Sequence, residues 1–129
     1  MALQIFILDP IATALEYAPK KIRNETGGTL AAGDLLYVTG WSEANTAFLV
    51  AKADADVPGG AARLVLRAVL ANLINGFGYR TYRLTGVDTS AAVAVGDPVY
   101  LSTSTPGSWT LTAPLAATSF QQVVGRVAV

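Results

Sequence analysis

Turn-forming residues interrupt this chain, from residue 25 onward, at intervals of about one strand plus one turn. The interruptions are Gly27-Gly28, Gly33-Asp34, Gly40, Gly59-Gly60, Asn75-Gly76, Gly86, Gly96-Asp97 and Pro106-Gly107. Glycine adopts backbone angles that other residues resist, and asparagine, aspartate and proline each favour turns for their own reasons. Short segments separated by such breaks are typical of all-β domains. The sequence therefore predicts an all-β fold.

The segments between the breaks are rich in Val, Leu, Thr, Tyr and Trp, which fit the half-buried surface of a sheet. We expect strands at 3–8, 35–39, 47–53, 79–85, 98–103, 108–112 and 121–129. The stretch 61–74 is ambiguous, because Arg63 and Arg67 recur at helical spacing while the same letters also alternate as a strand. We expect a strand in its first half and a turn over 72–78, with a helix as the open alternative.

One short phrase occurs twice, as AGDLLYVT at 32–39 and VGDPVYLS at 95–102, with a constant offset. Its glycine permits a positive φ, and its aspartate can hydrogen-bond the nearby backbone. We therefore interpret Gly33-Asp34 and Gly96-Asp97 as structural turns that each lead into a strand. The duplication predicts a compact β-barrel or sandwich with two pseudo-repeated halves, at about residues 25–60 and 88–129.

The first 24 residues differ in character from the rest. An apolar, strand-like run at 3–8 is closed by Asp9-Pro10, and a less regular connector follows it. The run has no charged residues before it and is too short to span a bilayer, so we expect neither a signal peptide nor a membrane span. The sequence predicts an extended N-terminal arm and connector at 1–24, ahead of a β-barrel-like domain at 25–129.

The arm is the candidate docking element. An apolar segment free of its own domain can add a strand to a neighbouring sheet. The residues that we expect to carry this contact are Leu3, Ile5, Phe6 and Ile7. Whether they dock on another protein or on the mates of an oligomer is left open by the sequence.

Composition argues against most chemical functions. The chain has no histidine and no cysteine, which removes the commonest general base, thiol nucleophiles, disulfides and the usual zinc ligands. We expect no catalytic residue, no metal site and no cofactor. Nine basic and nine acidic residues cancel, so nucleic acid and anionic membranes are poor partners. Hydrophobic residues make up 52% and charged residues 14%, which predicts contact with other subunits in a homo-oligomer.

Three polar clusters contain residue types that occur in binding sites, but their patterns favour structural roles. Asp54 and Asp56 lack the further acids of a calcium loop. The hydroxyl residues at 102–105 precede Pro106-Gly107 and fit a turn. The basic residues at 20–23 fit a solvated linker better than a phosphate site.

The order of motifs in the second half is informative. Gly96-Asp97 is followed by VYLS at 99–102, then by a glycine-bearing turn before Trp109-Thr110, and finally by QVVGRV at 122–127. In the first half, GDLLYVTG followed by VAKADA repeats part of this order. Over roughly residues 25–129 the chain resembles a module found on the virions of tailed bacteriophages, in head decoration or cement proteins and in fibre proteins.

The resemblance implies a β-barrel-like or tulip-like domain without enzymatic activity, made in the host cytoplasm and assembled as an oligomer, commonly a trimer, on the phage surface. The function we expect is a structural virion protein that decorates and stabilises the capsid by binding across assembled subunits of the major capsid protein. The alternative is a tail or head fibre component that attaches to a host receptor or glycan. For that role the candidate contacts are the aromatic residues Trp41, Trp109 and Tyr82.

Overall fold

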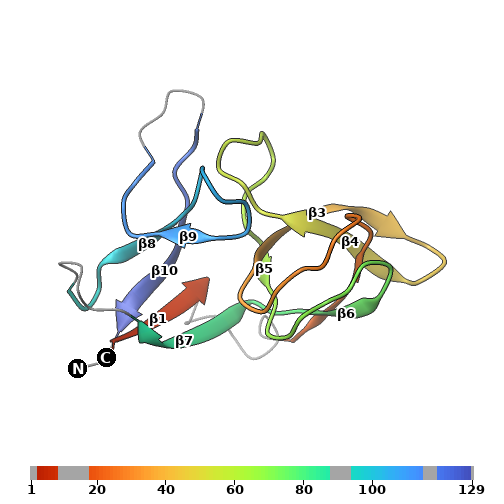
Figure 1. Cartoon of the computed structure of the whole chain (residues 1–129), viewed down its shortest axis with the longest axis horizontal. Helices are drawn as coiled ribbons and strands as arrows, with labels where there is room; N and C mark the ends of the chain where they lie inside the picture. The colour runs from red at the N-terminus through yellow and green to blue at the C-terminus, as the bar shows by residue number, and fades with distance from the viewer. Residues whose placement is uncertain (1–2, 9–17, 88–93, 115–118, 129) are drawn as a thin grey trace.

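The structure, a computed structural model, describes residues 3–8, 18–87, 94–114 and 119–128. Within these ranges it contains ten strands and no helix. The strands form two five-stranded sheets that lie side by side along the long axis, with β5 between them (Figure 1). Together they make a nearly closed, barrel-like arrangement, which confirms the all-β class.

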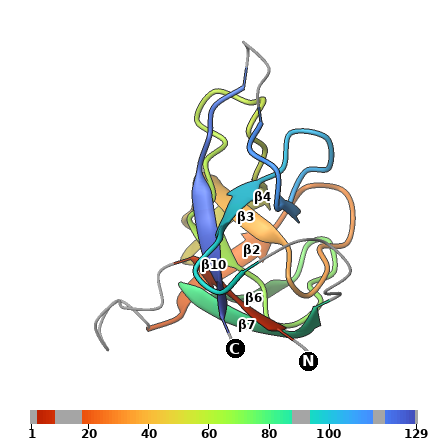
Figure 2. The same cartoon turned by 90° about the vertical axis from the view of Figure 1, so that its left-hand side faces the viewer.

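The first sheet gathers strands from both ends of the chain. In spatial order it contains β7 (Thr81–Val87), β1 (Leu3–Leu8), β10 (Val123–Ala128), β8 (Pro98–Leu101) and β9 (Trp109–Thr110). All of its ladders are antiparallel. Figure 2, which views the molecule from the side of this sheet, shows β10 close to both β1 and β8.

The second sheet is built from the five strands that lie between β1 and β7 in the sequence. In spatial order it contains β5 (Leu64–Val65), β3 (Leu35–Ser42), β4 (Ala47–Lys52), β2 (Lys20–Asn24) and β6 (Asn75–Gly78). The β2–β4 ladder is parallel and the other ladders are antiparallel. β5 and β6 end this order, but Val65 of β5 also pairs with Tyr79 through two backbone hydrogen bonds, so β6 is the edge strand that pairs on one side among the described residues.

Neighbouring residues on two strands supply two separate cores. Successive side chains of a strand point to opposite faces, so Leu35 and Val65 join a core shared with the first sheet, while Leu36 and Leu64 face a core under the second. The shared core is completed chiefly by β8 and β10, and the second core by Ile22, Val50 and three leucines of the connecting loops. The start of β3 and all of β5 are therefore buried on both faces.

The repeated phrase forms the same turn twice. Gly33 and Gly96 have φ of 89° and 93°. In each copy the aspartate N–H donates to the carbonyl of the alanine three residues before it, Ala31 or Ala94, at 3.1 Å. The aspartate carboxylate of each copy accepts the N–H of the first turn residue at 2.8 Å. Each turn is then held by one partner residue, Leu66 for the first and Val127 for the second, through two backbone hydrogen bonds. We call these turns corners.

A third corner, at 71–74, has the same backbone hydrogen bonds but contains neither glycine nor aspartate. Ile74 N–H donates to the Ala71 carbonyl at 3.3 Å, and Leu73 takes the glycine position with φ of 64°. Its partner is Asn24, whose carbonyl accepts Leu73 N–H at 2.6 Å and whose N–H donates to Ile74 at 3.1 Å. The residues that precede the first and third corners, Leu30 and Leu70, also pair with each other.

The expectation of a free N-terminal arm is corrected. Residues 3–8 form the strand that the sequence predicts, but β1 lies between β7 and β10 and pairs with both. Residues 20–24, expected to be connector, form β2 between β4 and β6. The domain therefore includes strands from the first 24 residues. A strand paired on both sides has no backbone edge left for a neighbour's sheet, so β1 cannot dock in the way expected.

The ambiguous stretch contains no helix. It forms β5, a bend at 67–68 and the third corner, so the strand expected in its first half is confirmed. The turn expected over 72–78 is partly wrong, because it ends at Ile74 and Asn75-Gly76 begins β6. Gly76 and Gly78 face inward, where a Cβ would come within 2.8 Å of the side chains of Leu70 and Leu64. These glycines serve close packing rather than a turn.

Two side chains join distant segments. Asn24 is fully buried; its amide donates to the carbonyls of Gly28 and Leu70 at 2.7 and 2.9 Å, and its oxygen accepts from Thr26. Gln122 exchanges two hydrogen bonds with the backbone of Ala62, at 2.7 and 2.9 Å. Because buried polar groups are costly unless paired, loss of these hydrogen bonds should be more costly at Asn24, which is fully buried, than at Gln122, which is partly buried.

Candidate functional site

Exposed apolar side chains gather along the stretch 69–77, which runs through the third corner into edge strand β6. Four of them define what we call the apolar ridge: Val69, Leu73, Ile74 and Phe77. Leu73 and Phe77 are 57% and 52% exposed. Phe77 lies on the outer face of β6 because its neighbours Gly76 and Gly78 face the core. Scattered exposed leucines are ordinary in soluble proteins, but four exposed apolar side chains within nine residues make this segment a candidate contact surface.

Leu73 is the least expected member of the ridge. A residue with a Cβ at positive φ loses about 1–2 kcal/mol relative to ordinary backbone. The equivalent positions of the other two corners are glycines. Backbone strain of this kind persists where the surroundings impose it and often accompanies a functional surface. The corner that departs from the glycine rule is therefore the one that presents a large apolar side chain to solvent.

A second apolar surface continues the inner face of the second sheet beyond its core. Val38 and Phe48 share a face with the buried Leu36 and Val50. The register of β3 and β4 shifts between Val38 and Gly40, so Trp41 lies opposite Phe48. Their rings meet edge to face with centroids 5.0 Å apart. Trp41 remains 47% exposed, so this aromatic pair is an accessible surface.

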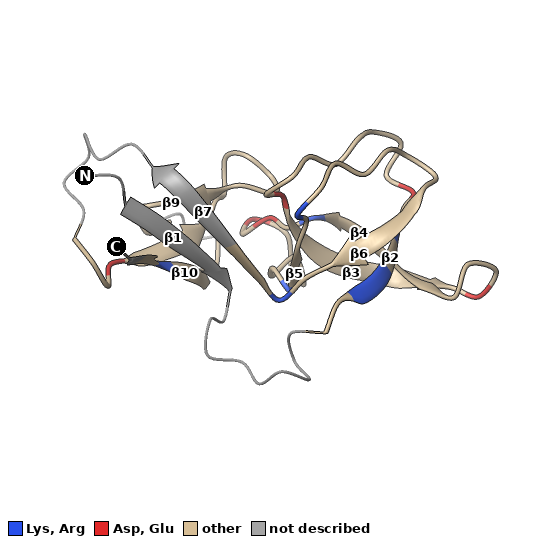
Figure 3. Cartoon of the chain, turned by 90° about the horizontal axis from the view of Figure 1, so that it is seen from below, with Lys and Arg blue, Asp and Glu red and all other residues tan. Residues whose placement is uncertain are grey.

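An open groove of about 440 Å³ lies beside this aromatic pair. Leu64, Val38 and Phe48 contribute its apolar part. The remaining lining residues are Lys20, Tyr37, Gly59, Ala61, Arg63 and Arg80. Three of the lining side chains are cations, and none of those described is acidic. We call this feature the cationic groove; Figure 3 shows basic residues at the start of β2 and near β5.

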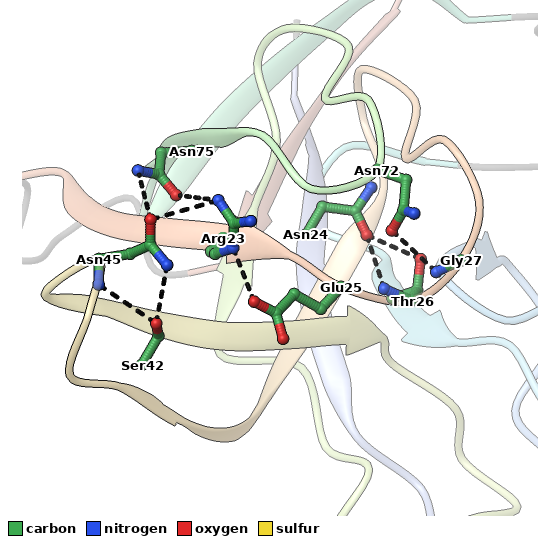
Figure 4. A network of polar contacts seen from close by, with 9 residues as sticks. All are labelled: Arg23, Asn24, Glu25, Thr26, Gly27, Ser42, Asn45, Asn72 and Asn75. Carbon is green, nitrogen blue, oxygen red and sulfur yellow. Dashed lines mark hydrogen bonds and ion pairs between the residues drawn. The ribbon is translucent and has the colours of Figure 1, made fainter.

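The outer face of the second sheet carries a polar network instead (Figure 4). Arg23 forms an ion pair with Glu25 at 2.6 Å and donates to Asn45 and Asn75 at 3.3 and 3.1 Å. Ser42 extends the network through Asn45. These donors and acceptors satisfy one another across β2, β6 and the β3–β4 hairpin. The network therefore ties edge strand β6 to the rest of the sheet.

The residues predicted from the sequence as sites do not come together. The side chains of Leu3, Ile5, Phe6 and Ile7 lie outside the described part of the structure, although their backbone lies within β1. Among the aromatic residues considered for glycan contact, Trp41 is exposed on the second sheet, whereas Tyr82 and Trp109 pack against the shared core from the first sheet. The three aromatic side chains therefore do not form a common platform.

The polar clusters form local structure. Asp54 accepts the N–H of Asp56 at 2.9 Å, and Ser119 donates to the Asp56 carboxylate. Ser102 accepts the N–H groups of Ser104 and Thr105 at 3.2 Å each, as a turn residue does. Within the described ranges, no group of three or more potential metal-ligating side chains is found.

The ridge and the groove were missed by sequence reasoning for different reasons. Leu73 and Ile74 read as ordinary apolar residues, and only the repeated order Leu-Ala-x-x at 30–33 and 70–73 hints that a corner recurs there. The groove joins residues from β2, β3, β4 and the segment around β5. Its one signal was the basic cluster at 20–23, in which Lys20 faces the groove and Arg23 the outer network.

No protein-family model matches this sequence, and no curated protein or solved structure matches it. Among the described residues, no helix has the length and apolar character that crossing a membrane requires.

Proposed function

We propose that this chain is a structural virion protein that decorates a tailed-phage capsid and stabilises it by binding across assembled subunits of the major capsid protein. The observation that carries the proposal is the apolar ridge, with a large side chain held at positive φ and exposed. The phage context comes from the order of motifs around Gly96-Asp97. The protein is made in the host cytoplasm, acts on the capsid surface and performs no catalysis.

The mechanism is linked binding. A ligand that binds only the assembled shell lowers the free energy of that state. A homotrimer that bridges neighbouring subunits adds the effect of high local concentration, so weak individual contacts hold firmly. Burial of the exposed half of a Leu, Ile or Phe side chain contributes roughly 1 kcal/mol. The four ridge residues therefore supply a weak contact, which a homotrimer repeats at neighbouring subunits.

The docking element in this proposal is the ridge rather than the arm. The ridge borders β6, which pairs with β2 on one side and ends the order of its sheet. Edge strands offer unpaired backbone groups to a partner strand. Phe77 on this strand, and the ridge residues that precede it, add apolar contact area that a partner covers.

Cosedimentation with purified capsids tests the proposal. We expect the wild-type chain to travel with assembled shells and not with unassembled capsid subunits. The double variant Ile74→Thr/Phe77→Thr removes about 2 kcal/mol of apolar contact and should bind roughly 30-fold more weakly. Val123→Thr changes an exposed valine on the first sheet and is the matched control. Equal binding of both variants, or no binding of the wild type to shells, contradicts the proposal.

A further inference from the structure

The cationic groove lies apart from the apolar ridge and shares no residue with it. We infer that the groove binds an acidic peptide segment in which carboxylates flank an apolar side chain. The inference goes beyond the capsid proposal, since a partner carrying such a segment need not be the capsid subunit.

The positive charges of the groove favour a negatively charged ligand. Lys20, Arg63 and Arg80 line the groove together. Within the described ranges the ion pairs join Arg23 to Glu25 and Lys52 to Asp34, so neither involves a groove cation. Arginine holds a carboxylate through two parallel hydrogen bonds, and lysine adds a compact positive charge. An anionic group brought into the groove therefore meets cations from three separate segments.

The apolar part selects a peptide over other anions. Leu64 is buried under the groove, and Val38 and Phe48 are partly exposed beside it. This surface favours an apolar side chain between the carboxylates. The groove volume of about 440 Å³ lies within the range of about 300–1,000 Å³ typical of ligand sites.

Carbohydrate and nucleic acid fit the lining less well. Sugar hydroxyls need hydrogen-bond acceptors as well as donors, and the Tyr37 hydroxyl is the one side-chain acceptor in the described lining. Nucleic acid is bound through many phosphate contacts, whereas this chain has zero net charge and the groove has three cations. A short acidic peptide can be bound by the three cations that line the groove.

Fluorescence anisotropy with a labelled probe peptide, Asp-Glu-Leu-Phe-Glu-Asp with blocked ends, tests the inference. We expect binding in 50 mM salt that weakens at least fivefold in 500 mM salt, because the contacts are ionic. The same peptide with Asn and Gln in place of its acids should not bind. The variant Lys20→Glu/Arg80→Glu should bind the acidic peptide at least tenfold more weakly. Lys21→Glu, on the adjacent and opposite-facing residue of β2, should bind within twofold of wild type.

Several outcomes would overturn the inference. Equal affinity for the acidic and neutral peptides would do so with the wild-type protein alone, whatever happens to the variants. Tighter binding of a heparin oligosaccharide or an oligothymidine, lost in the same variant, would assign the groove to polyanions. A change in sedimentation of Lys20→Glu/Arg80→Glu without peptide would assign it to a second copy. Tighter peptide binding by Asp9→Asn/Glu16→Gln would assign it to the chain's own connector.

Discussion

The corners at 31–34 and 71–74 share a turn and differ in the residue that occupies its strained position. Both place their third residue at positive φ and both exchange two backbone hydrogen bonds with one partner. The first uses Gly33, which adopts this angle freely, and the second uses Leu73, which does not. The turn is therefore imposed by the surrounding pairing. The residue at its strained position is left free to serve another purpose, which we propose is contact with a partner.

The largest effect is expected from breaking the anchor of the third corner. Asn24→Ala removes the buried amide that bonds Leu70 and Gly28, so we expect the free energy of unfolding to fall by about 3 kcal/mol. Urea denaturation at 25 °C measures this. Asn72→Ala is the control, because the only hydrogen bond found for its side chain among the described residues is an exposed one, to Gly27 N–H. A loss of the same size in the control would show that Asn24 has no special role.

Adding a methyl group at the first corner should have the next largest effect. At Gly33 a Cβ would meet nothing within 4 Å, so the change introduces backbone strain without a clash. We expect Gly33→Ala to lose about 1–2 kcal/mol of stability, and Gly96→Ala to behave alike. Gly28 is equally open but has no positive φ. Chemical denaturation of Gly28→Ala should show no loss, and a loss equal to that of Gly33→Ala would refute the strain argument.

The aspartates of the corners should contribute less. Asp97→Ala removes the acceptor for Ala94 N–H, and we expect a loss of about 1 kcal/mol. Asp97→Asn keeps an oxygen in the same place and should lose less than half as much. Thermal denaturation of the two variants in parallel compares them. Equal losses would mean that the negative charge, rather than the acceptor, matters at this corner.

Much of the architecture can be predicted from the sequence because it depends on local rules. Glycine at positive φ and alternating β-branched residues act within a few residues of each other, so the two glycine-aspartate corners and β3, β4 and β8 are readable. The strands β2 and β6 are not readable in this way. The inward positions of β6 are glycines that admit Leu64 and Leu70, and β2 buries an asparagine that long-range hydrogen bonds satisfy.

The candidate sites depend on contacts that no local pattern encodes. The arm was expected to be free because an apolar run before Asp9-Pro10 looks the same whether it pairs inside its own sheet or not; the pairing of β1 with β7 and β10 decides this. The cationic groove needs Lys20, Arg63 and Arg80 to meet from three segments. The third corner was hidden because its strained residue is leucine.

Leu73→Gly tests most directly whether this corner keeps leucine for contact rather than for folding. Glycine at this position relieves the backbone strain, which stabilises the folded variant. The variant also loses the partial burial of the leucine side chain, and glycine has more backbone freedom in the unfolded chain; both effects destabilise it by a similar amount. The account predicts that the free energy of unfolding changes by less than about 0.5 kcal/mol while capsid binding, measured by cosedimentation, weakens about fivefold. Loss of more than about 1.5 kcal/mol of stability with capsid binding intact would contradict it.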